Sequence, residues 1–216
     1  MAEQRMGLLV AGFNYAAVDA DEFNAWYDTE HIPERRRVPG FIAAERWIGA
    51  EDPKVSIATY ELQSPAVLQS PEYLAIAHDN LSPWSRRMVG RCQRICRFEA
   101  EQIQPGNGLG PKNAGGMLLA AMNVAAPAEA EFNAWYDTEH IARLSQVPGC
   151  LAARRFRTSS GRQRYVSLYH LSDPSVAASD AWKAAVETPW TLKVRPHIAD
   201  MLRLVLRRYS GAGLQA

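Results

Sequence analysis

Apolar residues along this chain alternate with polar ones in some stretches and recur every three or four positions in others. The first pattern indicates strands and the second indicates helices. The first half of the chain is predicted to contain strands at about 7–15, 41–49, 54–62 and 92–103 and helical regions at about 20–37 and 65–90. The second half is predicted to contain strands at about 116–124, 150–158, 163–171 and 199–209 and helices at about 128–147 and 173–197. Each half therefore follows the order βαββαβ.

The agreement between the two halves comes from an internal repeat. The string EFNAWYDTEHI occupies residues 22–32 and returns without change at residues 131–141. The turn Val38-Pro39-Gly40 likewise returns as Val147-Pro148-Gly149. We predict two ferredoxin-like repeats joined by a linker rich in glycine and proline, with the boundaries 1–104, 105–115 and 116–216.

A four-stranded antiparallel sheet with both helices on one side leaves its other face bare, and such a face has to be covered. The nearest cover is the sheet of the other repeat. We therefore predict an α+β fold in which the two sheets face each other within one chain, as the subunits of a twofold dimer would. The space between the sheets is where we expect a ligand.

Charge and cysteine content exclude several classes of function. The 216 residues include 24 basic and 23 acidic side chains, and no basic stripe follows any element, so nucleic acid is not expected as a partner. The short run Arg35-Arg36-Arg37 is interpreted as a solvated helix end. The apolar run at 8–13 is too short for a secretory leader or a membrane span. Three cysteines, an odd count, suit a reducing compartment, so we expect a cytoplasmic protein without a membrane partner.

The segment from Phe23 to Pro33, followed by Val38-Pro39-Gly40, resembles the helix signature of the dimeric α+β barrel superfamily, closest to its EthD-like and stress-responsive branches. The resemblance implies two ferredoxin-like repeats that form an intramolecular barrel, a pseudo-dimer within one chain, and leaves a further homodimer open. Members of that superfamily include cofactor-free monooxygenases, polyketide cyclases, lactone isomerases, haem-dependent relatives and proteins without known activity.

The repeated string contains a histidine that can contact two neighbours on its helix. His31 follows Tyr27 by four residues and Asp28 by three. A carboxylate beside the imidazole would orient it for proton transfer. Alternatively, the histidine complements the helix dipole and Asp28 only fastens the turn. Pro33 should kink this helix or start a tighter turn directly after His31, whereas the second copy carries Ala142 and is expected to run straight.

The second copy repeats the same cluster, so the catalytic candidates are His31, His140, Asp28 and Asp137. Glu30 and Glu139 stand beside the histidines and are candidates for ligand binding. No metal site is predicted, because Glu30 and His31 are adjacent on a helix and point about 100° apart.

Polar residues also recur on the predicted strands, as Arg46 with Arg155 and Tyr60 with Tyr169. Inside a barrel, such an arginine could hold a carboxylate or phenolate, and such a tyrosine could donate a proton or stack on a ring. Equally, the arginine could pair at the rim and the tyrosine could bridge the sheets. His170 adjoins Tyr169, so strand alternation lets at most one of the two point inward. All five residues are ligand-binding candidates.

The two halves also differ at matching positions, so two pockets need not be equivalent. The differing pairs are His78 with Glu187, Glu61 with His170, and Glu45 with Arg154.

Three functions are consistent with these features. The first is an enzyme that acts on a small aromatic or polyketide-like molecule as a cofactor-independent oxygenase, cyclase or isomerase, with His31 or His140 as acid or base. The second is a ligand-binding or stress-related barrel without turnover. The third is a haem-binding barrel; no cofactor is expected for the other two. Phosphate-binding loops, nucleophile elbows and zinc-ligand spacings do not occur in the sequence.

Overall fold

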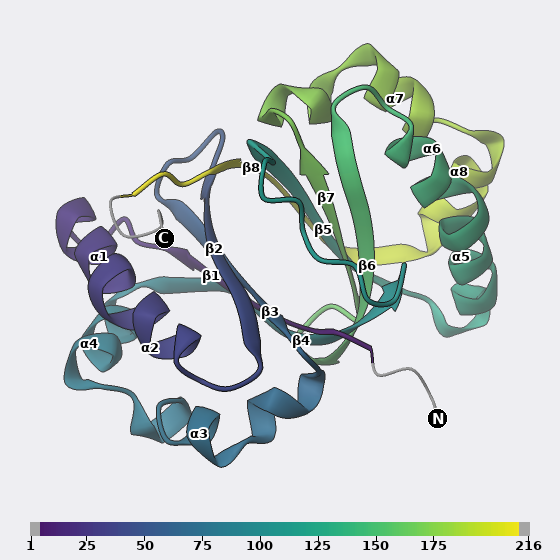
Figure 1. Cartoon of the computed structure of the whole chain (residues 1–216). Coiled ribbons are helices and arrows are strands. Elements are labelled where there is room, and N and C mark those ends of the chain that lie inside the picture. The colour runs from purple at the N-terminus through teal and green to yellow at the C-terminus, as the bar shows by residue number, and fades with distance from the viewer. Residues whose placement is uncertain (1–4, 212–216) are drawn as a thin grey trace.

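The computed structural model describes residues 5–211 and contains eight long strands in this range (Figure 1). The strands of the first half are β1 (Gly7–Asn14), β2 (Phe41–Gly49), β3 (Val55–Leu62) and β4 (Gln93–Gln104). Those of the second half are β5 (Gly116–Val124), β6 (Cys150–Ser160), β7 (Tyr165–Leu171) and β8 (Ile198–Arg208). All eight lie where the apolar pattern predicted strands.

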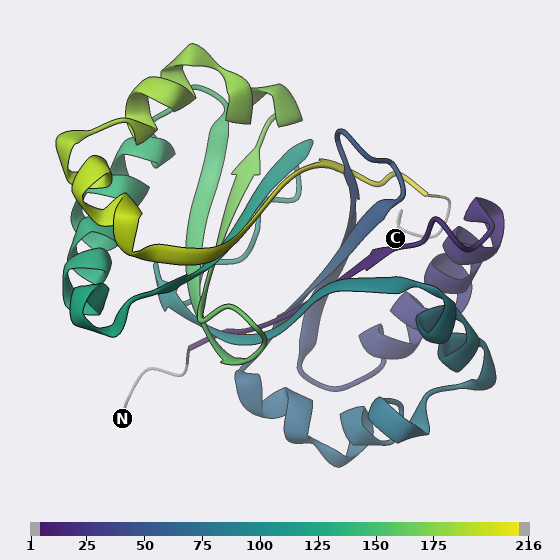
Figure 2. The ribbon, with the colours of Figure 1, turned by 180° about the vertical axis from the view of Figure 1, so that it is seen from behind.

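The strands form one closed antiparallel barrel in the order β1-β3-β2-β8-β5-β7-β6-β4. Within each half the order is the same, because β2-β3-β1-β4 corresponds to β6-β7-β5-β8. Two seams join the halves: β4 pairs with β6, and β2 pairs with β8. From behind, β8 is seen to reach across to the β2–β3 hairpin (Figure 2). One chain therefore closes a barrel in which neither sheet keeps a free edge.

Helices cover the outer face of each sheet (Figure 1). The first half has α1 (Ala20–Trp26), η1 (Tyr27–His31), α2 (Ile32–Arg36), η2 (Pro65–Gln69), α3 (Pro71–Leu74), η3 (His78–Asn80) and α4 (Pro83–Arg91). The second half has η4 (Ala126–Ala128), α5 (Glu129–Trp135), η5 (Tyr136–His140), α6 (Ile141–Ser145), η6 (Pro174–Ala178), α7 (Asp180–Val186), α8 (Pro189–Val194) and η7 (Arg195–His197). No described helix has the length and apolar character needed to cross a bilayer.

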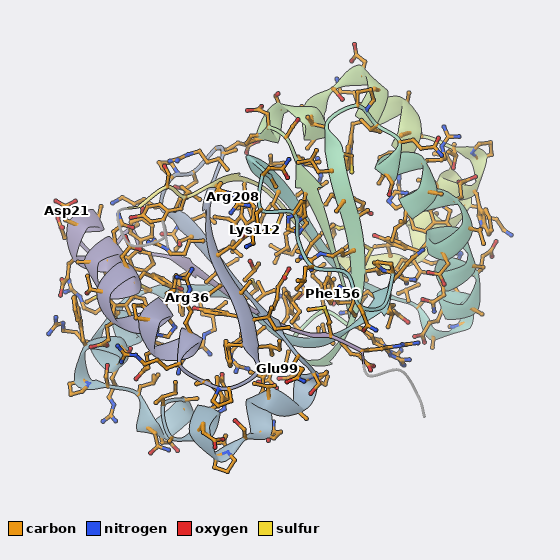
Figure 3. The ribbon with its side chains drawn as sticks, in the orientation of Figure 1. Asp21, Arg36, Glu99, Lys112, Phe156 and Arg208 are labelled. Atoms are coloured by element: carbon orange, nitrogen blue, oxygen red, sulfur yellow. The ribbon has the colours of Figure 1, made fainter. Side chains whose placement is uncertain are left out.

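Alternation along the strands divides the apolar residues between the barrel interior and the helix-covered face. On β1, Leu8 and Val10 pack inside the barrel, whereas Leu9 and Phe13 pack under the helices. Trp47 and Phe156, from opposite halves, join the interior cluster and are almost fully buried, and Figure 3 shows Phe156 pointing into the space between the sheets. Apolar side chains of the described residues thus fill the middle of the barrel, where we expected a ligand space between the sheets.

Residues 105–115 connect β4 to β5 and pass over one end of the barrel. The backbone oxygen of Gly108 accepts a hydrogen bond from Arg154 at 3.0 Å, and the N–H of Gly110 donates to Glu61 at 2.8 Å. Arg208 donates to the Ala114 oxygen at 2.5 Å and lies near Lys112 at this end (Figure 3). The connection is therefore fastened to both halves.

Candidate functional site

Each copy of the repeated string contains a π-helical turn, η1 in the first half and η5 in the second. The Ile32 N–H bonds to the Tyr27 oxygen, and the Ile141 N–H bonds to the Tyr136 oxygen, five residues back in both cases. Because the turn occurs with and without a following proline, Pro33 does not cause it, and the prediction that the second helix runs straight is wrong. Such turns are frequent at functional sites.

The π-helical turn brings residues five apart into contact. The His31 ring lies 4.6 Å from that of Trp26, and the His140 ring lies 4.2 Å from that of Trp135, between ring centroids. His31 also meets Tyr27 edge-on at 5.3 Å. The histidine of each string is thus held by aromatic rings on its own helix and faces the sheet below it.

Both histidines are buried and uncharged. Burial, followed by the nearby Arg35 and Arg46 guanidinium groups, holds the pKa of His31 well below its usual range. Burial, followed by Arg155, lowers the pKa of His140 to about 3. The Nδ1 atom of each ring is enclosed and has no hydrogen-bond partner in the structure. Each imidazole therefore keeps a lone pair for a proton, but it is a weaker base than an exposed histidine.

The aspartates of the repeated string do not orient these histidines. Asp28 accepts hydrogen bonds from Arg46 at 3.0 Å and from the Tyr209 hydroxyl at 2.9 Å, one on each carboxylate oxygen. Asp137 pairs with Arg155 at 2.9 Å. The predicted contact between Asp28 and His31 is therefore not formed, and the aspartates anchor arginines of the strands instead.

The glutamates of the string fasten one helix to the next. Glu30 accepts hydrogen bonds from the hydroxyl groups of Ser82 at 2.5 Å and Ser85 at 3.2 Å. Ser82 is the N-cap residue of α4. Glu139 accepts one from Thr188, the N-cap residue of α8, at 2.6 Å. A carboxylate at a helix N-terminus is favourable for the dipole, so these contacts account for both glutamates without a ligand.

The recurring strand arginines lie on the helix-covered face of the barrel. Arg46 is fully buried, donates to Asn24 at 2.8 Å as well as to Asp28, and lies 3.9 Å from the ring centroid of Tyr209. Arg155 makes the equivalent contacts to Asn133 and Asp137. Both arginines pair with a carboxylate, as the alternative interpretation expected, but they do so between the sheet and its helices and not at the rim.

The recurring tyrosines share that face and lie near the histidines. Tyr60 is 6.5 Å from His31, and Tyr169 is 6.5 Å from His140, between ring centroids. The Tyr60 hydroxyl is buried without a hydrogen-bond partner, and burial raises its pKa well above the usual value. Tyr60 therefore offers a neutral hydroxyl beside the imidazole.

His170 lies inside the barrel, as alternation with Tyr169 requires. Its Nε2 is 2.9 Å from Arg154, which in turn pairs with Glu61 at 2.6 Å. All three are nearly buried under the connection at 105–115. A Cβ atom on Gly110 would lie about 3 Å from side-chain atoms of all three residues, so a larger residue there would require these side chains to shift. This cluster closes one end of the barrel.

A cavity of about 570 Å³ opens between the first sheet and its helices. Its inner wall carries His31 and Tyr60, together with Leu9 and Ala11 from β1. The rest of its lining comes from Phe13, Arg35, Tyr73, Ala77, His78, Asp79, Leu81, Val89, Arg94, Arg97 and Ser160. Its volume is in the range of sites for small molecules. The structure thus brings two of the predicted residues together, at a place between sheet and helices.

Arg35 is a pocket residue that the sequence analysis missed. The run Arg35-Arg36-Arg37 was expected to be solvated, but the Arg35 side chain is only 4% exposed. It follows His31 by four residues, so both share one helix face. That spacing was the signal in the sequence, and the two arginines that follow Arg35 concealed it.

A second cavity, of about 170 Å³, lies at the equivalent place in the second half. It is bordered by His140 and Tyr169, but Leu144 replaces Arg35 and Trp182 replaces Tyr73. Helix α7 continues to Val186 here, whereas α3 ends at Leu74 and a longer loop follows. The single residue Glu187 corresponds to the four residues 78–81, so the longer loop gives the first cavity an additional wall.

Solved structures share this architecture at low sequence identity. An anthrone oxidase-like protein aligns over 100% of this chain and 95% of its own, with a TM-score of 0.68 and 13% identity. A protein named as a putative monooxygenase, from Fusobacterium nucleatum, aligns over 97% and 94%, with a TM-score of 0.64 and 8% identity.

A chlorite dismutase from Candidatus Nitrospira defluvii aligns over 97% of this chain and 93% of its own, with a TM-score of 0.62 and 10% identity. The chain adopts the dimeric α+β barrel fold. No protein-family model and no curated protein matches the sequence. The resemblance of the repeated string to dimeric α+β barrels is thereby confirmed for the fold.

Proposed function

We propose that this dimeric α+β barrel protein is a cofactor-independent oxygenase that acts on a hydroxylated aromatic, polyketide-like molecule in the first cavity. The observation that carries the proposal is the neutral, unpartnered imidazole of His31 on the wall of a 570 Å³ cavity. Aromatic side chains, among them Tyr60 and Tyr73, complete a lining suited to a flat ring system.

The proposed reaction oxidises an activated CH₂ group of the substrate to a carbonyl group. His31 accepts a proton from the substrate, which leaves an electron-rich anion able to reduce molecular oxygen. One oxygen atom enters the new carbonyl group, and the other leaves as water with the two hydrogens of the CH₂ group. The Tyr60 hydroxyl would hold an oxygen atom of the substrate beside the imidazole.

The names of similar structures support oxygen chemistry over the cyclase and isomerase alternatives. One is called anthrone oxidase-like, and another is named as a monooxygenase. All three reaction types need a base beside an aromatic substrate, so the requirement for oxygen separates them.

Haem fits the described residues poorly. A histidine that binds a metal donates its other ring N–H to a carboxylate or a backbone oxygen, which raises its basicity. The Nδ1 atoms of His31, His140 and His170 have no such partner. Haem therefore has no part in the proposed reaction.

Oxygen uptake with 1,8-dihydroxyanthrone tests the proposal, after subtraction of the rate without protein. We expect His31→Gln to lower turnover about 100-fold or more, because general base catalysis contributes that much. The matched variant His140→Gln should change turnover less than about twofold. Equal losses in both variants, or a full rate in a folded His31→Gln protein, would contradict the proposal. Binding without any oxygen uptake would favour a ligand-binding barrel.

A further inference from the structure

Arg35 is a buried cation of the first cavity that makes one hydrogen bond to the described residues. Its Nη1 donates one hydrogen bond, to the backbone oxygen of Ile76 at 3.0 Å. Glu34 forms an ion pair with it at 3.6 Å, a distance too long for a hydrogen bond. A guanidinium group has five N–H donors, so most of those on Arg35 remain for another acceptor. An anion in the cavity would provide such an acceptor.

Arg35 lies at the proposed reaction site. Arg35 lines the first cavity together with His31 and Tyr60. After burial, Arg35 is the largest cause of the low pKa of His31, so the two groups lie within strong electrostatic range. The Tyr73 ring lies 5.5 Å from the guanidinium carbon and limits where it can move.

The other two arginines that line the cavity are less suited to bind an anion. Arg97 is already paired with Glu99 and donates to the Tyr73 hydroxyl at 3.1 Å. Arg94 is exposed and lies above the Phe13 ring at 5.8 Å. Arg35 is therefore the buried cation of this cavity whose side chain donates no hydrogen bond to a carboxylate or a hydroxyl group of the described residues.

We propose that Arg35 binds the ionised hydroxyl oxygen of the substrate and stabilises it as His31 takes the proton. The O–H bond breaks, the proton moves to the imidazole, and the electron pair stays on oxygen beside the guanidinium group. The inference rests on the proposed function and names its substrate class, phenols and enols with an acidic hydroxyl. The second cavity, which has Leu144 at this position, would not bind such an anion.

A phenol whose colour reports its ionisation tests this role at equilibrium. Alizarin absorbs at longer wavelength when ionised, and its pKa when bound is measured by titration in the absence of oxygen. An adjacent positive charge should lower the pKa of the bound dye by about 1 to 3. Arg35→Leu, which copies Leu144, should abolish that decrease. Arg35→Lys should retain part of it, because the charge remains but the paired donors are lost.

Arg37→Leu is the matched control, because it removes the same charge from an exposed site two residues away. It should leave the pKa of the bound dye unchanged. An equal pKa in wild type, Arg35→Leu and Arg35→Lys would overturn the inference, and so would failure of the dye to bind to wild type. Because the titration needs no turnover, a shifted pKa without oxygen uptake would contradict the proposed reaction and leave the role of Arg35 standing.

Discussion

The two cavities of this barrel are built on the same string of residues and differ in what surrounds it. Both have a buried histidine on a π-helical turn and a tyrosine on the strand below. The first cavity has Arg35 and a four-residue loop in its lining and a volume of about 570 Å³. The second cavity has Leu144 in its lining and a volume of about 170 Å³. The identical residues therefore preserve the helix and its packing, and the residues that diverged determine which half can bind a substrate.

This comparison changes how the repeated cluster is understood. Asp28 and Glu30 are identical in the second copy, yet their contacts are to Arg46 and to the cap of α4. Both contacts, to the strand arginine and to the cap of the next helix, are needed wherever this helix packs on this sheet. Retention of a cluster after duplication is thus explained here by folding, and the chemical difference arises at neighbouring positions.

The largest expected effect concerns the buried ion pairs of the two halves. Arg46→Leu would leave Asp28, whose side chain is 11% exposed, without its cation, and should cost about 3–5 kcal/mol. Arg155→Leu should cost only about 1–3 kcal/mol, because Asp137 is 53% exposed and regains water. Urea denaturation measures both. Equal costs would show that the exposure of the carboxylate does not govern stability here.

Next in size is the effect of shortening the loop of the first cavity. Deletion of Asp79, Asn80 and Leu81 gives the first half the length of the second and removes one wall of the cavity. We expect affinity for a hydroxyanthraquinone to fall about 100-fold, equal to about 2.7 kcal/mol. Fluorescence titration provides the measurement. The reciprocal control inserts the same three residues after Glu187 and should leave binding in the first cavity unchanged.

A smaller effect on the free energy of unfolding is expected from pH, and it should be similar for the buried histidines of the two halves. The pKa of His140 is lowered to about 3, against about 6.5 in an unfolded chain. Between these values the unfolded chain binds a proton that the folded chain does not. Stability therefore falls as pH falls from about 6.5 toward 3, by up to about 1.4 kcal/mol per pH unit for each such histidine.

Denaturation at several pH values tests this slope. His140→Gln and His31→Gln should each flatten it by a similar amount, because the pKa of His31 is lowered in the same direction. His197→Gln, on the exposed surface, should not. A steeper slope in either buried variant would show that the folded protein binds these protons.

The smallest effect concerns the tyrosine hydroxyl groups. Tyr60→Phe removes a buried hydroxyl that lacks a partner in the protein, so stability should hardly change. Affinity for the hydroxyanthraquinone should fall about fivefold, equal to about 1 kcal/mol for one hydrogen bond. Tyr169→Phe should leave affinity unchanged. A loss in the Tyr169 variant alone would place the ligand in the second cavity.

Much of the fold was predictable, because strand periodicity and a repeated string constrain it strongly. β2 and β5 occupy exactly the ranges 41–49 and 116–124 that the pattern predicted. The face on which the ligand space lies was not predictable in the same way. Alternation places Arg46 and Tyr60 on one side of β2 and β3, but it does not say which side is packed solid.

The site was predicted in part. His31, a candidate from the repeated string, and Tyr60, a candidate from the strands, lie together at the first cavity. Arg35 was missed, because three consecutive arginines do not show which one turns toward the sheet. The contacts of Asp28 depend on a strand 18 residues away, and no local pattern records them.

A crystal structure with a bound hydroxyanthraquinone tests the central claim most directly. We predict density for the ring system between the first sheet and its helices, in contact with His31 and Tyr60 and with a hydroxyl oxygen beside Arg35. Density between the two sheets, or in the second cavity alone, would contradict the account.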